Sequence, residues 1–283
     1  MRITKIKTDM IQNYVNYLTS LKGMSANTVS AYQKDLIDFV KWSKQNIKDC
    51  RWSMITRNDV DRYVTAMVDR GLSPATTNRR LSAISGLYNY FRRQGLLTEN
   101  PCKYESRRKI ANRCPNTISI NELRAAYQYS RGAVRTMLGI LITTGIRIGE
   151  LLAIQWEDID FHANRISILG KGSKGRVVYT TGEMLASLRK YKDGHVVSGT
   201  IFRYSQRQCR YMIYLALRPY CNSRQLSPHA IRHTFATNIV SAGCNVTHLA
   251  QILGHTNIST TQHYIDMSNI VTKDITLSNN ILN

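Results

Sequence analysis

The sequence predicts a mainly α-helical protein of two domains, with a small β-hairpin in the second domain. The first 100 residues carry apolar side chains at helical spacing and no alternating, strand-like run. A basic segment without clear periodicity, residues 102–115, follows the helix-breaking Asn100-Pro101 pair. Beyond it, helical patterns flank two short β-type runs around a glycine-rich turn. A chain of 283 residues is long enough for two separate cores.

Four helices are predicted in the first domain, residues 1–101. They cover residues 8–21, 25–42, a segment beginning at residue 56, and 74–94. Ser25 is placed to cap the second helix, and Thr56 with Asp59 resembles a capping box for the third. Ser73 followed by Pro74 is typical of a cap and first helical position for the fourth. Four helices without a strand predict a small bundle.

Residues 102–115 are interpreted as an interdomain linker. Its basic side chains Arg107, Arg108, Lys109 and Arg113 suit contact with a DNA backbone. The alternative is an ordinary solvated loop.

The second domain, residues 116–283, is predicted to be helical around one hairpin. Helices are expected over 119–129, 133–143, 147–154, 183–192, 204–218, 228–243 and 245–254. The hairpin is expected from residues 165–169 and 176–180, which flank the turn Gly170-Lys-Gly-Ser-Lys-Gly175. Residues from about 267 form a C-terminal tail.

Charge points to a polyanionic partner. The formal net charge is +21, and both halves of the chain are basic. Residues 1–110 hold 20 Lys and Arg against 9 Asp and Glu, and residues 111–283 hold 19 against 9. Two basic bodies suggest that the chain grips one polyanion, with nucleic acid favoured and a generally basic protein as the alternative. Residues 233–283 carry Lys273 as their single Lys or Arg, so the tail is expected to contact protein rather than DNA.

Metal, cofactor and membrane functions find no support in the sequence. The six cysteines show no Cys-x-x-Cys spacing, so we expect buried or idle thiols and no zinc site. No apolar run approaches the ~20 residues of a membrane span, and the first residues lack the apolar stretch of a signal peptide. We therefore expect a cytoplasmic protein that uses no metal and no cofactor.

One set of polar residues in the second domain suits phosphodiester chemistry. Arg147 lies in Thr144-Gly-Ile-Arg-Ile-Gly-Glu150, and Lys171 lies in the Gly-Lys-Gly turn. The segments His229-Ala-Ile-Arg-His233 and Leu-Gly-His255 follow, and then Tyr264. A tyrosine can attack phosphorus, arginines can hold the phosphate oxygens, and a lysine can protonate the leaving oxygen. Glu150 has no second carboxylate near it in sequence, which argues against a two-metal nuclease, so we expect it to orient an arginine or stabilise a helix.

At these residues the chain resembles the tyrosine recombinase (phage integrase) family. Six residues occur in the family's order and spacing: Arg147, Lys171, His229, Arg232, His255 and Tyr264. The resemblance implies that Tyr264 is the nucleophile, that the two arginines clamp the phosphate, and that the histidines lie in the same site. It also implies that Lys171 is the general acid, with Lys174 as the alternative. His233, His248 and His263 are expected to be structural or exposed.

The resemblance extends to the first domain and implies a SAM-like core-binding domain before a mixed α+β catalytic domain. It is carried by Ser25-Ala-Asn-Thr-Val29 and Arg80-Leu-Ser-Ala-Ile84. Sequence-specific DNA contacts are expected on the polar faces of the second and fourth helices, where a solvated face is the alternative. The candidates are Asn27, Thr28, Lys34, Asn78, Arg79 and Arg80, together with Lys174 in the turn.

The implied function is site-specific DNA recombination through a 3′-phosphotyrosine intermediate and a Holliday junction, for integration, excision or resolution. It implies a homo-tetramer on two DNA sites, with possible accessory proteins and no ATP or metal. The compact size resembles the Xer-like or transposon-resolvase type. Ile265-Asp266 departs from the Thr-His that many relatives have after the nucleophile, which bears on the subfamily. A type IB topoisomerase and a non-catalytic DNA-binding regulator are the alternatives. The tail is expected to dock on a neighbouring protomer, or else on its own domain.

Overall fold

The computed structural model describes residues 8–103, 108–109, 116–169, 175–193, 199–223 and 225–254. The chain forms two compact units, residues 1–112 and 113–283. The predicted fold class is confirmed: both units are mostly helical, and the second carries one small sheet. None of the described helices is both long and apolar enough to cross a membrane.

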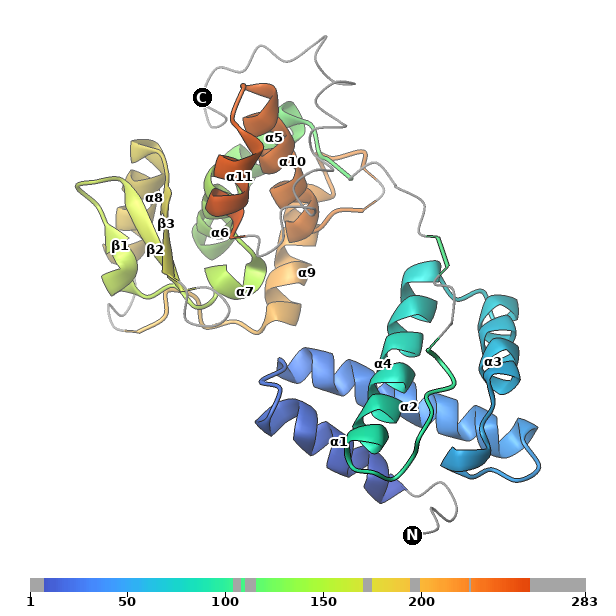
Figure 1. Ribbon diagram of the computed structural model, residues 1–283. Coiled ribbons are helices and arrows are strands. Elements are labelled where there is room, and N and C mark those ends of the chain that lie inside the picture. The colour runs from blue at the N-terminus through green and yellow to red at the C-terminus, as the bar shows by residue number, and fades with distance from the viewer. Residues whose placement is uncertain are drawn as a thin grey trace. The chain divides into compact units, whose positions relative to one another are not determined.

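The first unit is a bundle of four α-helices (Figure 1). They are α1 (Thr8–Ser20), α2 (Ala26–Asn46), α3 (Arg57–Asp69) and α4 (Pro74–Arg93), with a short 3₁₀ turn, η1 (Trp52–Met54). The predicted caps are present. The Ser25 hydroxyl accepts from the Thr28 N–H, Thr56 and Asp59 form a capping box, and the Ser73 hydroxyl accepts from the Thr76 N–H. The core between the helices is rich in aromatic side chains, including Phe39, Trp52, Tyr63, Tyr88 and Phe91.

The second unit is built around α6 (Gly132–Thr144), a helix that is buried along most of its length. Other helices surround it: α5 (Ile120–Tyr129), α8 (Gly182–Asp193), α9 (Gln206–Leu217) and α10 (Pro228–Ser241) (Figure 1). Two shorter helices follow among the described residues of this unit, α7 (Ile148–Leu151) and α11 (Val246–Leu253). Within this unit α11 packs against α10 and β3, which brings the end of the described chain beside the sheet.

The sheet has three antiparallel strands in the order β1-β2-β3. Strands β2 (Arg165–Leu169) and β3 (Gly175–Tyr179) are the predicted hairpin, and Ile166, Ile168 and Val178 point into the core. The prediction missed the third strand, β1 (Ile159–Asp160), and the 3₁₀ turn before it, η2 (Trp156–Asp158). A two-residue strand is too short to show alternation in the sequence, and its pairing with β2 defines it.

Candidate active site

Arg147 lies at the junction between α6 and α7. Gly145 ends α6 in the left-handed conformation, with φ of 62°, and Arg147 caps α7 in an extended conformation. The backbone N–H of Arg147 donates to Glu150 Oε2 at 2.8 Å, and its Nη1 donates to Oε1 at 3.0 Å. The arginine side chain remains 46% exposed. Glu150 therefore orients an arginine, as expected, and leaves that arginine open to a ligand.

Arg232 lies on α10 and is almost fully buried, with 3% of the residue exposed. Its Nη1 donates to the Gly145 carbonyl at 2.8 Å, and its Nη2 donates to the Leu253 carbonyl at 2.7 Å. Because Leu253 also accepts from Arg147 Nη1 at 3.3 Å, one carbonyl links the two predicted clamp arginines. Residues far apart in the sequence thus meet at the end of α11.

Three arginines bind the carboxyl end of α11. Arg147 Nη2 donates to the Gly254 carbonyl at 3.2 Å, and Arg176 Nε donates to the Ile252 carbonyl at 2.8 Å, besides the two bonds to Leu253. The last carbonyls of a helix have no partner within the helix and carry its negative dipole end, so guanidiniums stabilise them. Gly254 ends α11 with φ of 63°, and His255 is the next residue in the chain.

Arg176 is the residue that the sequence analysis missed in this cluster. It is the second residue of β3, and its Nη1 and Nη2 donate to the two Glu150 oxygens at 3.0 and 2.8 Å. The side chains of Arg176 and Glu150 are only 13% and 10% exposed. Burial by itself would raise the pKa of Glu150, but hydrogen bonds from Arg176 and the Arg147 N–H, with both positive charges, hold it below its ordinary value. Glu150 is therefore an ionised link between two arginines.

His229 lies in the first turn of α10, three residues before Arg232, and the residue is exposed. Its ring contacts the His233 ring edge-on, with centroids 4.3 Å apart. Neighbouring protein atoms partly desolvate the imidazole, and Arg232 and Arg147 add positive charge, so the pKa of His229 is lowered. A neutral imidazole at neutral pH can accept a proton.

The remaining predicted site residues lie outside the described residues. These are Lys171, Lys174, His255 and Tyr264. The structure nonetheless fixes the two strands on either side of the lysine-bearing turn, since Leu169 pairs with Gly175. It also fixes Gly254, directly before His255.

The six DNA-contact candidates on the first unit differ in accessibility. Asn27 and Lys34 are exposed, and Thr28 is half-buried. Arg79 and Arg80 of α4 instead form ion pairs with Asp35 and Asp38 of α2, and the Arg80 side chain is only 14% exposed.

Asn78 is buried, with 8% of the residue exposed, and exchanges two hydrogen bonds with the Arg108 backbone at 2.9 and 3.0 Å. The Arg108 backbone thus holds Asn78 within the fold, and acidic side chains of α2 hold Arg80. Asn27 and Lys34 remain as exposed candidates for DNA contact.

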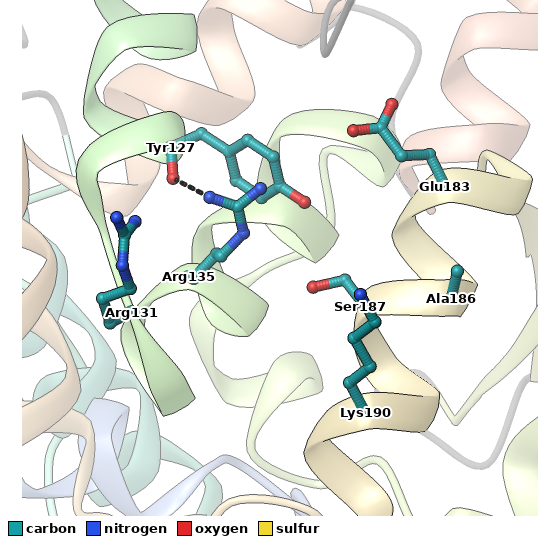
Figure 2. A pocket seen from close by; sticks show the side chains of 7 residues that line it. All are labelled: Tyr127, Arg131, Arg135, Glu183, Ala186, Ser187 and Lys190. Carbon is teal, nitrogen blue, oxygen red and sulfur yellow. Dashed lines mark hydrogen bonds between the residues drawn. The ribbon is translucent and has the colours of Figure 1, made fainter.

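A polar hollow lies apart from this arginine cluster, between the α5–α6 junction and α8 (Figure 2). It measures roughly 400 Å³ and is lined by Tyr127, Arg131, Arg135, Glu183, Ala186, Ser187 and Lys190. Arg135 stacks over the Tyr127 ring at 4.2 Å and donates to the Tyr127 carbonyl at 3.1 Å. The hollow shares no residue with the arginine cluster. In the part of the chain that the structure describes, no group of three or more His, Cys, Asp or Glu side chains could hold a metal ion.

Comparison with known proteins identifies two matching families. The phage integrase family matches residues 117–269, and the N-terminal SAM-like domain of phage integrases matches residues 11–95. The tyrosine recombinase XerC of Listeria welshimeri is 30% identical, over 89% of this chain and 91% of that protein. The tyrosine recombinase XerD of Oceanobacillus iheyensis is 25% identical, over 94% and 96%. Among solved structures, the XerH site-specific recombinase bound to a palindromic difH substrate has a TM-score of 0.76 at 17% identity, over 93% of this chain and 82% of that one.

Proposed function

The chain belongs to the phage integrase family and is a tyrosine site-specific recombinase, and from this premise we propose which of its residues carry the reaction. One observation carries the proposal. Arg147, at the junction of α6 and α7, and Arg232, on α10, meet at the Leu253 carbonyl, two residues before His255. The half-exposed Arg147 beside an oriented carboxylate is suited to bind a phosphate, because a guanidinium matches phosphate oxygens in geometry and charge.

In the proposed reaction, the Tyr264 phenol oxygen attacks the scissile phosphorus while Arg147 and Arg232 bind the non-bridging oxygens. The bond from phosphorus to the 5′ oxygen breaks, and a 3′-phosphotyrosine forms. His229, neutral because its pKa is lowered, accepts the phenol proton. Lys171 donates a proton to the departing 5′ oxygen. The 5′ hydroxyl of a partner strand then attacks the phosphotyrosine and releases the tyrosine, so that no external energy source is needed.

The proposed partner is double-stranded DNA, on which four protomers assemble across two sites to exchange strands through a Holliday junction. The net charge of +21 supports such a polyanionic partner. The proposed substrate is DNA of the cell or of a mobile element, and the proposed location of the reaction is the cytoplasm.

Replacement of Tyr264 by phenylalanine tests the nucleophile, since it removes only the attacking oxygen. Tyr264→Phe is expected to bind DNA normally and to form no covalent complex with a nicked suicide substrate on a denaturing gel. Tyr129→Phe is the matched control, because Tyr129 lies in the same unit and is 66% exposed. A shifted protein–DNA band from Tyr264→Phe would refute the assignment.

We further propose that Asn27 and Lys34 on α2 contribute to recognition of the DNA site. Both are exposed, whereas Asn78 and Arg80 are held within the fold. Footprinting of Asn27→Ala and Lys34→Ala in the full chain should show weaker protection, and Lys48→Ala, an exposed lysine beyond α2, is the control. Loss of a phosphate contact at Lys34 should also reduce the salt dependence of binding by about 0.9 in log–log slope. Wild-type footprints from both α2 variants would contradict this assignment.

A further inference from the structure

Arg176 is an arginine whose described bonds all go to protein groups near the clamp. It follows the turn that contains Lys171 and Lys174, and it belongs to β3. Its three nitrogens donate to the Ile252 carbonyl and to both Glu150 oxygens, at 2.8 to 3.0 Å. The described bonds of this guanidinium thus hold one carboxylate and one helix end of the same unit.

The first group that Arg176 holds is the carboxylate of Glu150. The same two oxygens accept the N–H and the Nη1 of Arg147. Without Arg176, Glu150 would lose two charge-assisted hydrogen bonds while it stayed 90% buried, and the carboxylate would turn or take up a proton. In either case the side chain of Arg147 would be held less firmly, by its bonds to the Leu253 and Gly254 carbonyls without the ionised carboxylate in its present orientation.

The second group is the carboxyl end of α11. The Ile252 carbonyl at this end accepts a hydrogen bond from Arg176 Nε. Gly254 also lies close against the guanidinium, since an added Cβ on Gly254 would lie 2.8 Å from Arg176 Nη1 and 3.0 Å from Cζ. The residue after Gly254 is His255. The guanidinium therefore holds the end of α11 up to Gly254, the residue directly before His255 in the sequence.

We propose that Arg176 is a positioning residue that joins three parts of the active site: the base of the lysine-bearing turn, the carboxylate that orients Arg147, and the end of α11. Its own backbone provides the first connection, and its side chain provides the other two. This inference rests on the proposed function of Arg147 and Lys171. Loss of Arg176 should lower the rate of strand cleavage and leave DNA affinity unchanged.

The test is single-turnover cleavage of a nicked suicide substrate at saturating protein, with DNA affinity measured separately by gel shift. Arg176→Met should cleave about 10- to 100-fold more slowly, the loss expected when reacting groups move by about 1 Å. Arg165→Met is the matched control, because Arg165 lies on the neighbouring strand and forms an exposed ion pair with Asp160. This control should cleave at the wild-type rate.

Two further measurements separate positioning from general stability. Guanidinium ion, at concentrations that do not unfold the protein, should restore part of the rate of Arg176→Met, because it can occupy the vacated position beside Glu150. The double variant Arg176→Met, Glu150→Gln should be no slower than the slower single variant, since the two side chains act as one unit. If Arg176→Met does not fold, Arg176→Lys, which keeps the charge but not the paired geometry, should still cleave more slowly than wild type.

The proposed function is tested independently by whether the wild-type protein forms a covalent complex with the suicide substrate on a denaturing gel. If wild type forms that complex, either of two results overturns this inference alone. The first is a wild-type cleavage rate for the Arg176 variants. The second is a slow rate that guanidinium does not raise, together with a double variant whose loss of rate is the product of the losses of Arg176→Met and Glu150→Gln.

Discussion

Gly145→Ala should destabilise the second unit and disturb the clamp together. Gly145 has φ of 62°, and an added Cβ would overlap the ring of Phe235 on α10. A non-glycine residue in the left-handed region costs about 1–2 kcal/mol, and forcing an extra methyl group into a packed core costs about 1–3 kcal/mol. The expected loss is therefore about 2–5 kcal/mol, a large share of a typical free energy of unfolding of ~5–15 kcal/mol.

Gly132→Ala is the matched control at the other end of α6. Gly132 has φ of 53°, and an added Cβ would meet no atom within 4 Å. This variant should lose only about 1–2 kcal/mol of the free energy of unfolding, the cost of placing a non-glycine residue in the left-handed conformation. The difference between the two variants then measures the overlap with Phe235.

Two buried cysteines allow each unit to be followed separately in the full-length chain. Cys209 is fully buried in the second unit, and Cys102 is 8% exposed in the first unit. Thiol labelling across a urea titration, read by mass spectrometry of the two peptides, should show the Cys209 midpoint lowered most by Gly145→Ala and less by Gly132→Ala. The Cys102 midpoint should not move.

The same substitution should slow cleavage, because the Gly145 carbonyl accepts from Arg232 and Phe235 lies one turn from that arginine. If Cys209 labelling has the same urea midpoint in the two alanine variants, Phe235 moves aside at no cost in free energy, and the packing argument is refuted.

Three other predictions concern the chemistry and the assembly. Lys171→Ala should cleave DNA with a bridging 5′ sulfur at near the wild-type rate while it remains slow on normal DNA, because that leaving group needs no proton; such rescue by Lys174→Ala instead would reverse the two roles. The cleavage rate should fall as pH drops through the lowered pKa of His229, since a protonated ring cannot accept the tyrosine proton. When the rate is measured over pH ~5–8, this fall should be absent in His229→Gln. The same depressed pKa makes a contribution to stability that is present above the unfolded-state pKa and is lost as pH falls through the folded-state pKa. Truncation after Met267 should preserve binding to a one-site DNA and impair synapsis of two sites in gel shifts; a truncated protein that recombines at the normal rate would show that the tail does not link protomers.

Much of the fold could be predicted because its signals are local. Thr56 with Asp59 form the expected capping box, and Ser73 before Pro74 caps α4 as expected. Such caps depend on residues within one helical turn, so the sequence displays them directly. The β2–β3 hairpin was predictable for the same reason, because its two strands are close in sequence and a short glycine-rich segment separates them.

The spacing of the polar residues predicted the members of the site, but the tertiary structure decided how they are held together. Arg176 meets Glu150, 26 residues earlier, and Ile252, 76 residues later. Arg79 and Arg80 meet Asp35 and Asp38 across the first bundle in the same way. Helical and strand periodicity shows which face of an element is buried, but it carries no information about which charged residue on another element lies opposite. The sequence by itself thus predicted the helices, the β2–β3 hairpin and the family, and it supplied the candidates for the reacting groups. The packing of α11 against β3 decided that an additional arginine, Arg176, lies between Glu150 and the end of α11, because a buried carboxylate and the last carbonyls of a helix both need a cation that only long-range contacts can bring to them.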